Sequence, residues 1–245
     1  MPTLLESRKR SPIRTSRFPT SGAFDLEIVG SENALGKISG DLFEIVETGP
    51  DAACIAMGDA CGHGVAAGML VVDVRRLLSM MAETQRDPGR MLTEMNRNVM
   101  RRFPTCRFVT LTLLAIDRNT LNIRYASAGQ AFYRIPAAGE AIRCDCENSP
   151  IGVFEDEEFT TLDSGALQPG ELLVLISDGF AETQSRDRGI YGEERLLRQF
   201  TENRACDSGE IISKLFTDVD TFKEGHSDHD DMTVVIVRLV PRTAG

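Results

Sequence analysis

The chain has 245 residues, enough for one large domain, and its 27 basic and 37 acidic residues give a net charge of −10. This negative charge argues against binding to nucleic acid or to an anionic membrane surface. No apolar run approaches the roughly 20 residues needed to span a bilayer, and the N-terminus lacks the apolar centre of a secretory signal. These features predict a cytoplasmic protein, in which the six cysteines are expected to be reduced.

The N-terminal segment differs in composition from the rest of the chain. Residues 1–21 are rich in Ser, Thr and Pro and have no apolar period. They contain five basic residues and one acidic residue. We predict that 1–21 is a disordered basic tail or a docking arm, and that 22–245 forms one domain.

The first part of this domain is predicted to contain a β-hairpin. Alternating apolar and polar residues predict strands over 24–29, 39–46 and 52–57, and a turn at Gly49-Pro50-Asp51 would pair the last two antiparallel. This register would bring Asp41, near the start of one strand, to the same end of the sheet as Asp59, which follows the other.

Asp59 also precedes a glycine-rich corner. Glycines at 62 and 64 permit backbone conformations closed to other residues, and the first amides of a helix favour nearby negative charge. The corner could hold a metal ion and a phosphate, or it could be an ordinary turn. A helix over 65–85 is predicted from apolar residues near the spacing of one helical face, with its methionines interpreted as core filling: Val65, Met69, Val72, Leu77, Met80 and Met81.

The rest of the chain is predicted to form a mostly antiparallel sheet with further helices. In chain order, the expected elements are a helix over 88–102, strands over 107–116, 121–126 and 131–135, a short strand near Phe159, a strand over 171–177, helices over 191–200 and 208–222, and a strand over 232–240.

Acidic residues stand at four predicted strand ends: Asp41, Asp59, Asp178 and the pair Asp230 and Asp231. Crowded carboxylates repel one another and raise one another's pKa, so they need counter-charge. No run of lysine or arginine lies nearby in the sequence, and all-oxygen ligands suit Mg²⁺ or Mn²⁺. Two such ions about 3.5–4 Å apart could bind phosphate oxygens and activate a water that attacks phosphorus.

The motifs, taken in order, resemble those of metal-dependent (type 2C) serine/threonine protein phosphatases. The closest branch is the bacterial one named for the sporulation phosphatase SpoIIE and the sigma-factor regulators, and the resemblance spans about residues 24–240. The motifs are Gly40-Asp41, Gly58-Asp59-Ala60-Cys61-Gly62-His63-Gly64, Ala126-Ser127-Ala128-Gly129, Ser177-Asp178-Gly179-Phe180-Ala181-Glu182, Tyr191-Gly192-Glu193-Glu194-Arg195-Leu196 and Asp230-Asp231-Met232-Thr233.

The resemblance implies an α+β fold, a four-layer α-β-β-α sandwich of two mostly antiparallel sheets flanked by helices. It also implies a site for two Mn²⁺ or Mg²⁺ ions at one end. By resemblance, Asp59 would bridge both ions, the Ala60 carbonyl would complete one site, and Asp178 and Asp230 would hold the other ion. Asp41 would act on the first ion directly or through water.

Further roles are considered for residues in or near these motifs. Asp231 and Glu44 would contact metal ligands rather than metals. His63 could protonate the leaving serine oxygen, or it could cap the helix start. Lys37 could replace the phosphate-binding arginine of eukaryotic relatives, or it could be a solvated surface lysine. Cys61 could make activity redox-sensitive, or it could be a buried inert thiol.

The resemblance implies that the chain is a protein phosphatase. Its substrate would be phosphoserine or phosphothreonine on a signalling protein such as an anti-sigma-factor antagonist. A separate regulatory partner is a further expectation. The alternatives are a catalytically weak pseudophosphatase that binds phosphoproteins and a phosphoesterase for small molecules.

The chain departs from the family pattern at two positions in or directly after the third motif. Ser127 and Gln130 stand where this branch usually has Asn and His.

Overall fold

The computed structural model describes residues 12–36, 38–62, 64–103, 108–145, 148–187, 189–226 and 230–242. In chain order, its elements are β1 (Arg14–Pro19), β2 (Phe24–Asn33), β3 (Asp41–Glu47), β4 (Ala52–Ala60), α1 (Val65–Ala82), α2 (Pro88–Arg102), β5 (Val109–Asp117), β6 (Asn122–Ala128), β7 (Phe132–Ile135), β8 (Ile142–Cys144), β9 (Leu162–Ala166), β10 (Leu172–Ile176), α3 (Asp178–Ala181), α4 (Glu193–Asn203), α5 (Ser208–Lys223) and β11 (Met232–Pro241). The predicted elements are present, except that the strand expected near Phe159 begins later, as β9.

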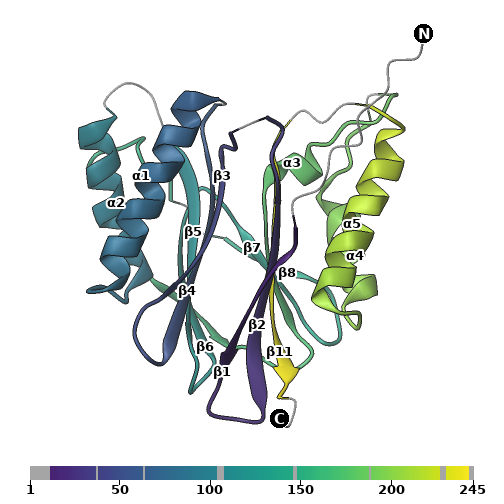
Figure 1. Ribbon diagram of the computed structural model, residues 1–245, viewed down its shortest axis with the longest axis horizontal. Coiled ribbons are helices and arrows are strands. Elements are labelled where there is room, and N and C mark those ends of the chain that lie inside the picture. Colours follow the sequence, from purple (N-terminus) through teal and green to yellow (C-terminus); the bar gives the residue numbers. More distant parts are fainter. Residues whose placement is uncertain are drawn as a thin grey trace.

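Two antiparallel sheets pack face to face, with helices on both outer sides (Figure 1). Sheet A has the order β1-β2-β11-β10-β7-β8, and sheet B has the order β3-β4-β5-β6-β9. Helices α1 and α2 cover sheet B, whereas α4 and α5 cover sheet A. The predicted four-layer α-β-β-α sandwich is therefore confirmed. In the described ranges, no helix is both long and apolar enough to cross a membrane.

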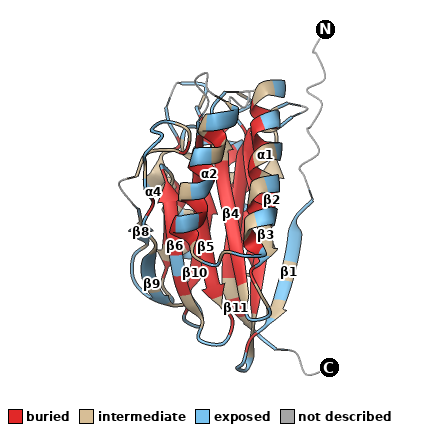
Figure 2. Cartoon of the chain, turned by 90° about the vertical axis from the view of Figure 1, so that its left-hand side faces the viewer, coloured by how far each residue is buried: buried red, intermediate tan, exposed pale blue. Residues whose placement is uncertain are grey.

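The central strands are buried because each sheet packs on both faces, whereas the edge strands β1, β8 and β9 are largely exposed (Figure 2). Three apolar layers result, one between sheet B and its helices, one between the two sheets, and one between sheet A and its helices. Fully buried members of these layers are, in the same order, Leu70, Leu92 and Leu113; Phe43, Met57 and Leu175; and Phe200, Leu215 and Ile236. Since side chains alternate along a strand, Asp41 shares the inter-sheet face with Phe43, and Asp59 shares it with Met57.

The helix predicted after Asp59 is confirmed as α1, but the prediction of its buried side is wrong for four of the six apolar residues, since only Leu77 and Met81 pack, partly buried, against the core. The side chains that pack inward are Leu70, Val71, Val74 and Leu78. Those that point to solvent are Val65, Met69, Val72 and Met80, which are 57–68% exposed. Helix α1 is apolar on more than one side, so its periodicity did not show which side meets sheet B.

The N-terminal segment is not wholly a disordered tail. Residues 14–19 form β1, paired antiparallel with β2, so the prediction is wrong for this stretch. Arg17 donates two hydrogen bonds to Glu27 Oε2, at 2.9 and 2.6 Å, and Glu27 is only 6% exposed. Ser208 donates to the other oxygen of Glu27 at 3.0 Å. Residues 1–11 lie outside the described ranges.

We expect Arg17→Gln to lower the free energy of unfolding by about 1–2 kcal/mol, because a buried carboxylate loses its charged partner. Arg14 offers a matched control, since its Nη1 lies 3.5 Å from Glu32 Oε2 and the side chain of Glu32 is more exposed than that of Glu27. Arg14→Gln should cost less than about 0.5 kcal/mol. Urea unfolding measures both variants, and equal losses would contradict this account.

Candidate metal centre

Asp41 and Asp59 lie directly opposite each other at one end of sheet B. They are Cα partners in the antiparallel β3–β4 pair, so the predicted hairpin and its effect on these two acids are confirmed. Gly40 makes their close approach possible. A Cβ at position 40 would lie 2.9 Å from Asp59 Oδ1 and 3.2 Å from the Ala60 carbonyl oxygen, which leaves no room for a side chain.

The other acids come from sheet A. Asp178 is the first residue of α3, one residue after Ser177 and two after the end of β10, and Asp231 directly precedes β11. The adjoining ends of β10 and β11 are held together by Ser177 and Thr233. The Ser177 amide donates to the Thr233 carbonyl, and the Thr233 amide donates to Ser177 Oγ, both at 2.9 Å. Four chain segments thus bring acids to the same end of the sandwich, at the top of Figure 1.

Asp231 holds the loop that leads into β3. Its Oδ1 accepts from the Leu35 amide at 2.5 Å, and its Oδ2 accepts from Ser39 Oγ at 2.8 Å and from the Gly40 amide at 2.7 Å. Both carboxylate oxygens are therefore engaged with the segment that positions Asp41. This geometry suits the expected role of Asp231 as a contact to a ligand-bearing segment, although the role itself stays a prediction.

The carboxyl groups at this end are poorly suited to carry charge without a counter-ion. Burial raises the pKa of Asp41 to about 8, and the neighbouring charge of Asp59 adds to the effect. Burial raises the pKa of Asp59 to about 7, with further contributions from Asp178, Asp230 and Asp231. The pKa of Asp178 is also raised, first by partial desolvation and then by the charge of Asp230.

These shifts predict a stability profile for the metal-free chain. Because the folded-state pKa values of Asp41 and Asp59 exceed the ordinary 3.8, the folded state binds more protons than the unfolded state between about pH 4 and 8. Stability should therefore fall as the pH rises through this window. We expect the melting temperature in chelator to decrease from about pH 5 to 8, and added Mg²⁺ to raise it more at the upper pH.

Thermal denaturation across this pH range checks the profile. Asp41→Asn is the informative variant, because it removes the group with the higher pKa and should flatten the slope. A melting temperature that rises or stays level over the window would contradict the assigned shifts.

The carboxylate oxygens at this end of the sandwich are the type of ligand that a hard divalent cation prefers. Asp41 is 2% exposed, and its Oδ2 makes no hydrogen bond of ordinary geometry within the described residues. A buried carboxylate oxygen of this kind is a ready ligand for Mg²⁺ or Mn²⁺. No three Asp, Glu, His or Cys side chains in the described ranges already converge as a metal cage. Binding would therefore require the carboxylates to draw together.

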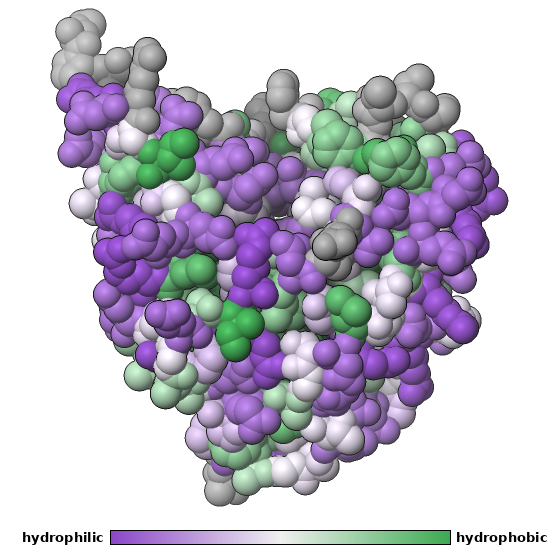
Figure 3. All heavy atoms as spheres, turned by 180° about the vertical axis from the view of Figure 1, so that it is seen from behind, coloured by the Kyte–Doolittle hydropathy of each residue, from purple (hydrophilic) through white to green (hydrophobic). Residues whose placement is uncertain are grey.

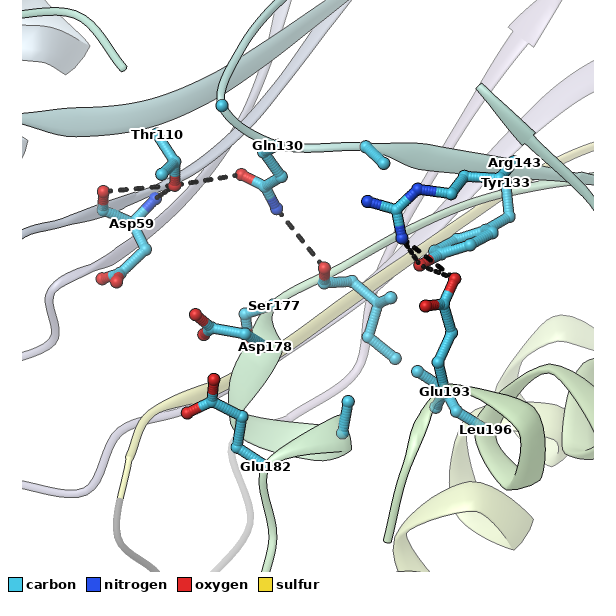
Figure 4. Close-up of a pocket in the computed structure, with 14 residues that line it drawn as sticks. Asp59, Thr110, Gln130, Tyr133, Arg143, Ser177, Asp178, Glu182, Glu193 and Leu196 are labelled. Atoms are coloured by element: carbon cyan, nitrogen blue, oxygen red, sulfur yellow. Dashed lines mark hydrogen bonds and ion pairs between the residues drawn. The ribbon is translucent and has the colours of Figure 1, made fainter. Parts of the chain in front are cut away.

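A cavity of about 260 Å³ opens beside Asp59 and Asp178 (Figure 4). At its other end lies Arg143 of β8, the one cation among the described residues that line it. Its guanidinium is already paired, at 3.0 Å from both Glu193 Oε1 and Asp145 Oδ2. The arginine therefore neutralises its own neighbours rather than the acids near Asp59.

Glu182 also lines this cavity, although sequence reasoning gave it no role. Its pKa is raised, first by burial and then by the charges of Asp178 and Asp230. The available signal was its spacing, because residues four apart share one face of a helical turn and Glu182 follows Asp178 by four. The structure thus adds one more carboxylate to this end of the sandwich.

Glu44 does not lie with these acids. It occupies the opposite face of β3 from Asp41, because it lies three positions further along the strand, and its Oε1 lies 3.3 Å from Arg75 Nε of α1. The expected contact with a metal ligand is therefore corrected to an ion pair with Arg75. Arg75 also binds Glu32, so these groups join α1 to β2 and β3.

Some predictions fall on residues outside the described ranges, namely Lys37 and His63. Their roles stay predictions. Cys61 is described, and its thiol is free and exposed rather than buried. The interpretation of Cys61 as a buried inert thiol is therefore wrong, because the residue lies beyond the end of β4, outside the apolar layers.

Comparison with known proteins assigns the family. Residues 49–240 match the model of Stage II sporulation protein E (SpoIIE). The phosphoserine phosphatase RsbU of Bacillus subtilis (strain 168) is 24% identical over 204 residues, covering 82% of this chain and 60% of RsbU. Across the five curated relatives, the chain spans from 24% to 60% of their length.

Solved structures agree on the fold. The SiaA-PP2C domain of Pseudomonas aeruginosa superposes with a TM-score of 0.77 at 20% identity, covering 86% of this chain and 85% of that domain. RsbX in complex with magnesium superposes with a TM-score of 0.66 at 16% identity, covering 94% of this chain and all (100%) of RsbX. Because the family model matches residues 49–240, which are most of this chain, the chain belongs to the SpoIIE family of PP2C-type serine phosphatases.

Proposed function

We propose that this chain is a Mn²⁺- or Mg²⁺-dependent protein phosphatase that hydrolyses phosphoserine or phosphothreonine on a signalling protein. The observation that supports this most is the meeting of acids from both sheets beside one cavity, with raised pKa values at Asp41, Asp59 and Asp178. Such carboxylates favour proton or cation binding, and they suit divalent ions that also bind phosphate oxygens.

In the proposed site, Asp59 would serve both ions, the Ala60 carbonyl would contribute to the first position, and Asp178 and Asp230 would hold the second. Asp41 serves the first position directly or through water. Bound Mn²⁺ or Mg²⁺ supplies Lewis-acid polarisation of the phosphate and makes a nucleophile available from water near neutral pH. The protein contributes the strands β3, β4 and β10, whose ends bring the segments that carry these oxygens to one end of the sandwich.

The proposed substrate is a phosphoprotein such as an anti-sigma-factor antagonist. Support comes from RsbU, a relative named as a phosphoserine phosphatase, and from the sigma-factor regulators that the motifs resemble. The rear surface of the molecule is mainly hydrophilic, with hydrophobic side chains in small separate groups (Figure 3). A polar partner in the cytoplasm, and a separate regulatory protein, are parts of the same proposal.

The test compares two substrates under controlled metal. The chain is stripped with chelator and then supplied with Mn²⁺ or Mg²⁺, and phosphate release is measured from a serine-phosphorylated anti-sigma-factor antagonist and from an aryl phosphate. We expect turnover only with metal and a higher kcat/KM on the phosphoprotein. Full turnover in chelator would overturn the metal-dependent mechanism. Binding without turnover would favour a pseudophosphatase, and preference for the aryl phosphate would favour a small-molecule phosphoesterase.

A further inference from the structure

The chain crosses from sheet B to sheet A between β6 and β7, close to the acids, and Gln130 stands at this crossing. Its backbone is firmly held. The Gln130 carbonyl accepts a hydrogen bond from Thr112 Oγ1 at 2.6 Å and another from Ser127 Oγ. Thr112 and Ser127 are both buried, and Gly129 makes the turn with φ +76°. Gln130 therefore starts from a fixed position.

The side chain of Gln130 spans the two sheets (Figure 4). Its Oε1 accepts from Thr110 Oγ1 on β5 at 3.5 Å, and its Nε2 donates to the carbonyl of Ile176 on β10 at 3.3 Å. Thr110 Oγ1 in turn accepts from the Asp59 amide at 3.2 Å. Ile176 lies two residues before Asp178. One amide thus connects the strand that carries Asp59 with the strand that leads to Asp178.

We infer that Gln130 is a positioning residue that sets the spacing between the two halves of the acidic site and so strengthens its binding of divalent cations. The inference rests on the metal site proposed above. Both side-chain contacts are longer than the 2.7–3.2 Å typical of N–H···O bonds and the 2.5–3.0 Å typical of O–H···O bonds. Closer approach of the β5 and β10 ends, which lie beside Asp59 and Asp178, would shorten both contacts, so the amide favours the closer spacing that a shared cation needs.

Direct Mn²⁺ binding, measured by isothermal titration calorimetry without substrate, tests this inference. Gln130→Leu keeps a similar volume but removes both contacts, and we expect the Mn²⁺ dissociation constant to rise about fivefold. Asn122→Leu is the matched control, because this amide lies at the opposite end of β6 and donates to Asp163 at 2.9 Å. It should leave Mn²⁺ binding unchanged.

A second variant tests the same contacts in case Gln130→Leu weakens Mn²⁺ binding only because it unfolds the protein. Thr110→Val removes the hydroxyl between Asp59 and Gln130 at nearly constant shape, and it should also weaken Mn²⁺ binding. In the double variant with Gln130→Leu, the two losses should be less than additive, because both break one chain of contacts. At saturating Mn²⁺, the KM of Gln130→Leu for an aryl phosphate should match that of the wild type.

The outcomes separate this inference from the proposed function. Absence of Mn²⁺ binding by the wild type would overturn both. Wild-type binding with an unchanged dissociation constant in Gln130→Leu would overturn the inference alone, whether the variant shows a lower melting temperature or a higher KM. The lower melting temperature would assign Gln130 a purely structural role, and the higher KM would assign it to substrate contact.

Discussion

Asp59→Asn is expected to abolish phosphatase activity, with a loss of at least about a thousandfold, while the fold stays intact. Partners that merely orient metal ligands are worth about 10- to 100-fold, so loss of the proposed bridging ligand should exceed this range. The substitution also removes a partly buried acid whose pKa is raised to about 7 by burial and by neighbouring acids. The metal-free variant should therefore melt at or above the wild-type temperature at neutral pH.

Phosphate release with saturating Mn²⁺, together with circular dichroism, measures the two halves of this prediction. Asp178→Asn should behave in the same way, because Asp178 is proposed to hold the second ion. Asp51→Asn is the matched control, since Asp51 is exposed at the opposite end of β4. Near-normal turnover of Asp59→Asn would end its assignment as a metal ligand.

Asp231→Ala is expected to have the largest effect on stability among single changes at this site. It removes the acceptor for Leu35, Ser39 and Gly40, and hydrogen bonds to a charged acceptor are worth about 1.5–3 kcal/mol each. Loss of its repulsion toward Asp41 and Asp59 offsets part of this cost. We expect the free energy of unfolding to fall by about 2–4 kcal/mol in chelator.

Asp230→Ala is the control for this measurement. Asp230 is exposed, and its Oδ1 accepts from the adjacent Asp231 amide. Its replacement should cost less than about 1 kcal/mol. Urea unfolding in chelator compares the two variants without a contribution from bound metal. Similar losses in both would show that Asp231 does not anchor the loop before β3.

Some features of this protein follow from local sequence alone. The two-residue period of strands 39–46 and 52–57 and the turn at Gly49-Pro50-Asp51 already pair Asp41 with Asp59, because an antiparallel hairpin has its register determined by the turn. The four-layer fold was inferred from the order of motifs that resemble those of a known family. The hairpin depends on residues close together in the chain, and the fold was inferred from a recurring motif pattern, so both could be predicted without the structure.

Other features depend on contacts between distant residues. Helix α1 is apolar on two sides, and only packing against sheet B selects Leu70 and Leu78 as the buried side chains. Residues 14–19 look like a polar tail in sequence, yet they form β1 because β2 offers an unpaired edge and Glu27 offers a buried carboxylate for Arg17.

In the candidate site, too, some features follow from the sequence and others from the tertiary structure. The sequence identifies the acids of the site, because each stands at the end of a predicted strand. It does not give the distances between their side chains. Tertiary structure decides which of them meet, places Glu44 against Arg75 on the other face of β3, and adds Glu182 and Gln130. The physical reason is that pKa shifts and cross-sheet hydrogen bonds depend on burial and proximity, which arise only when sheets A and B pack together.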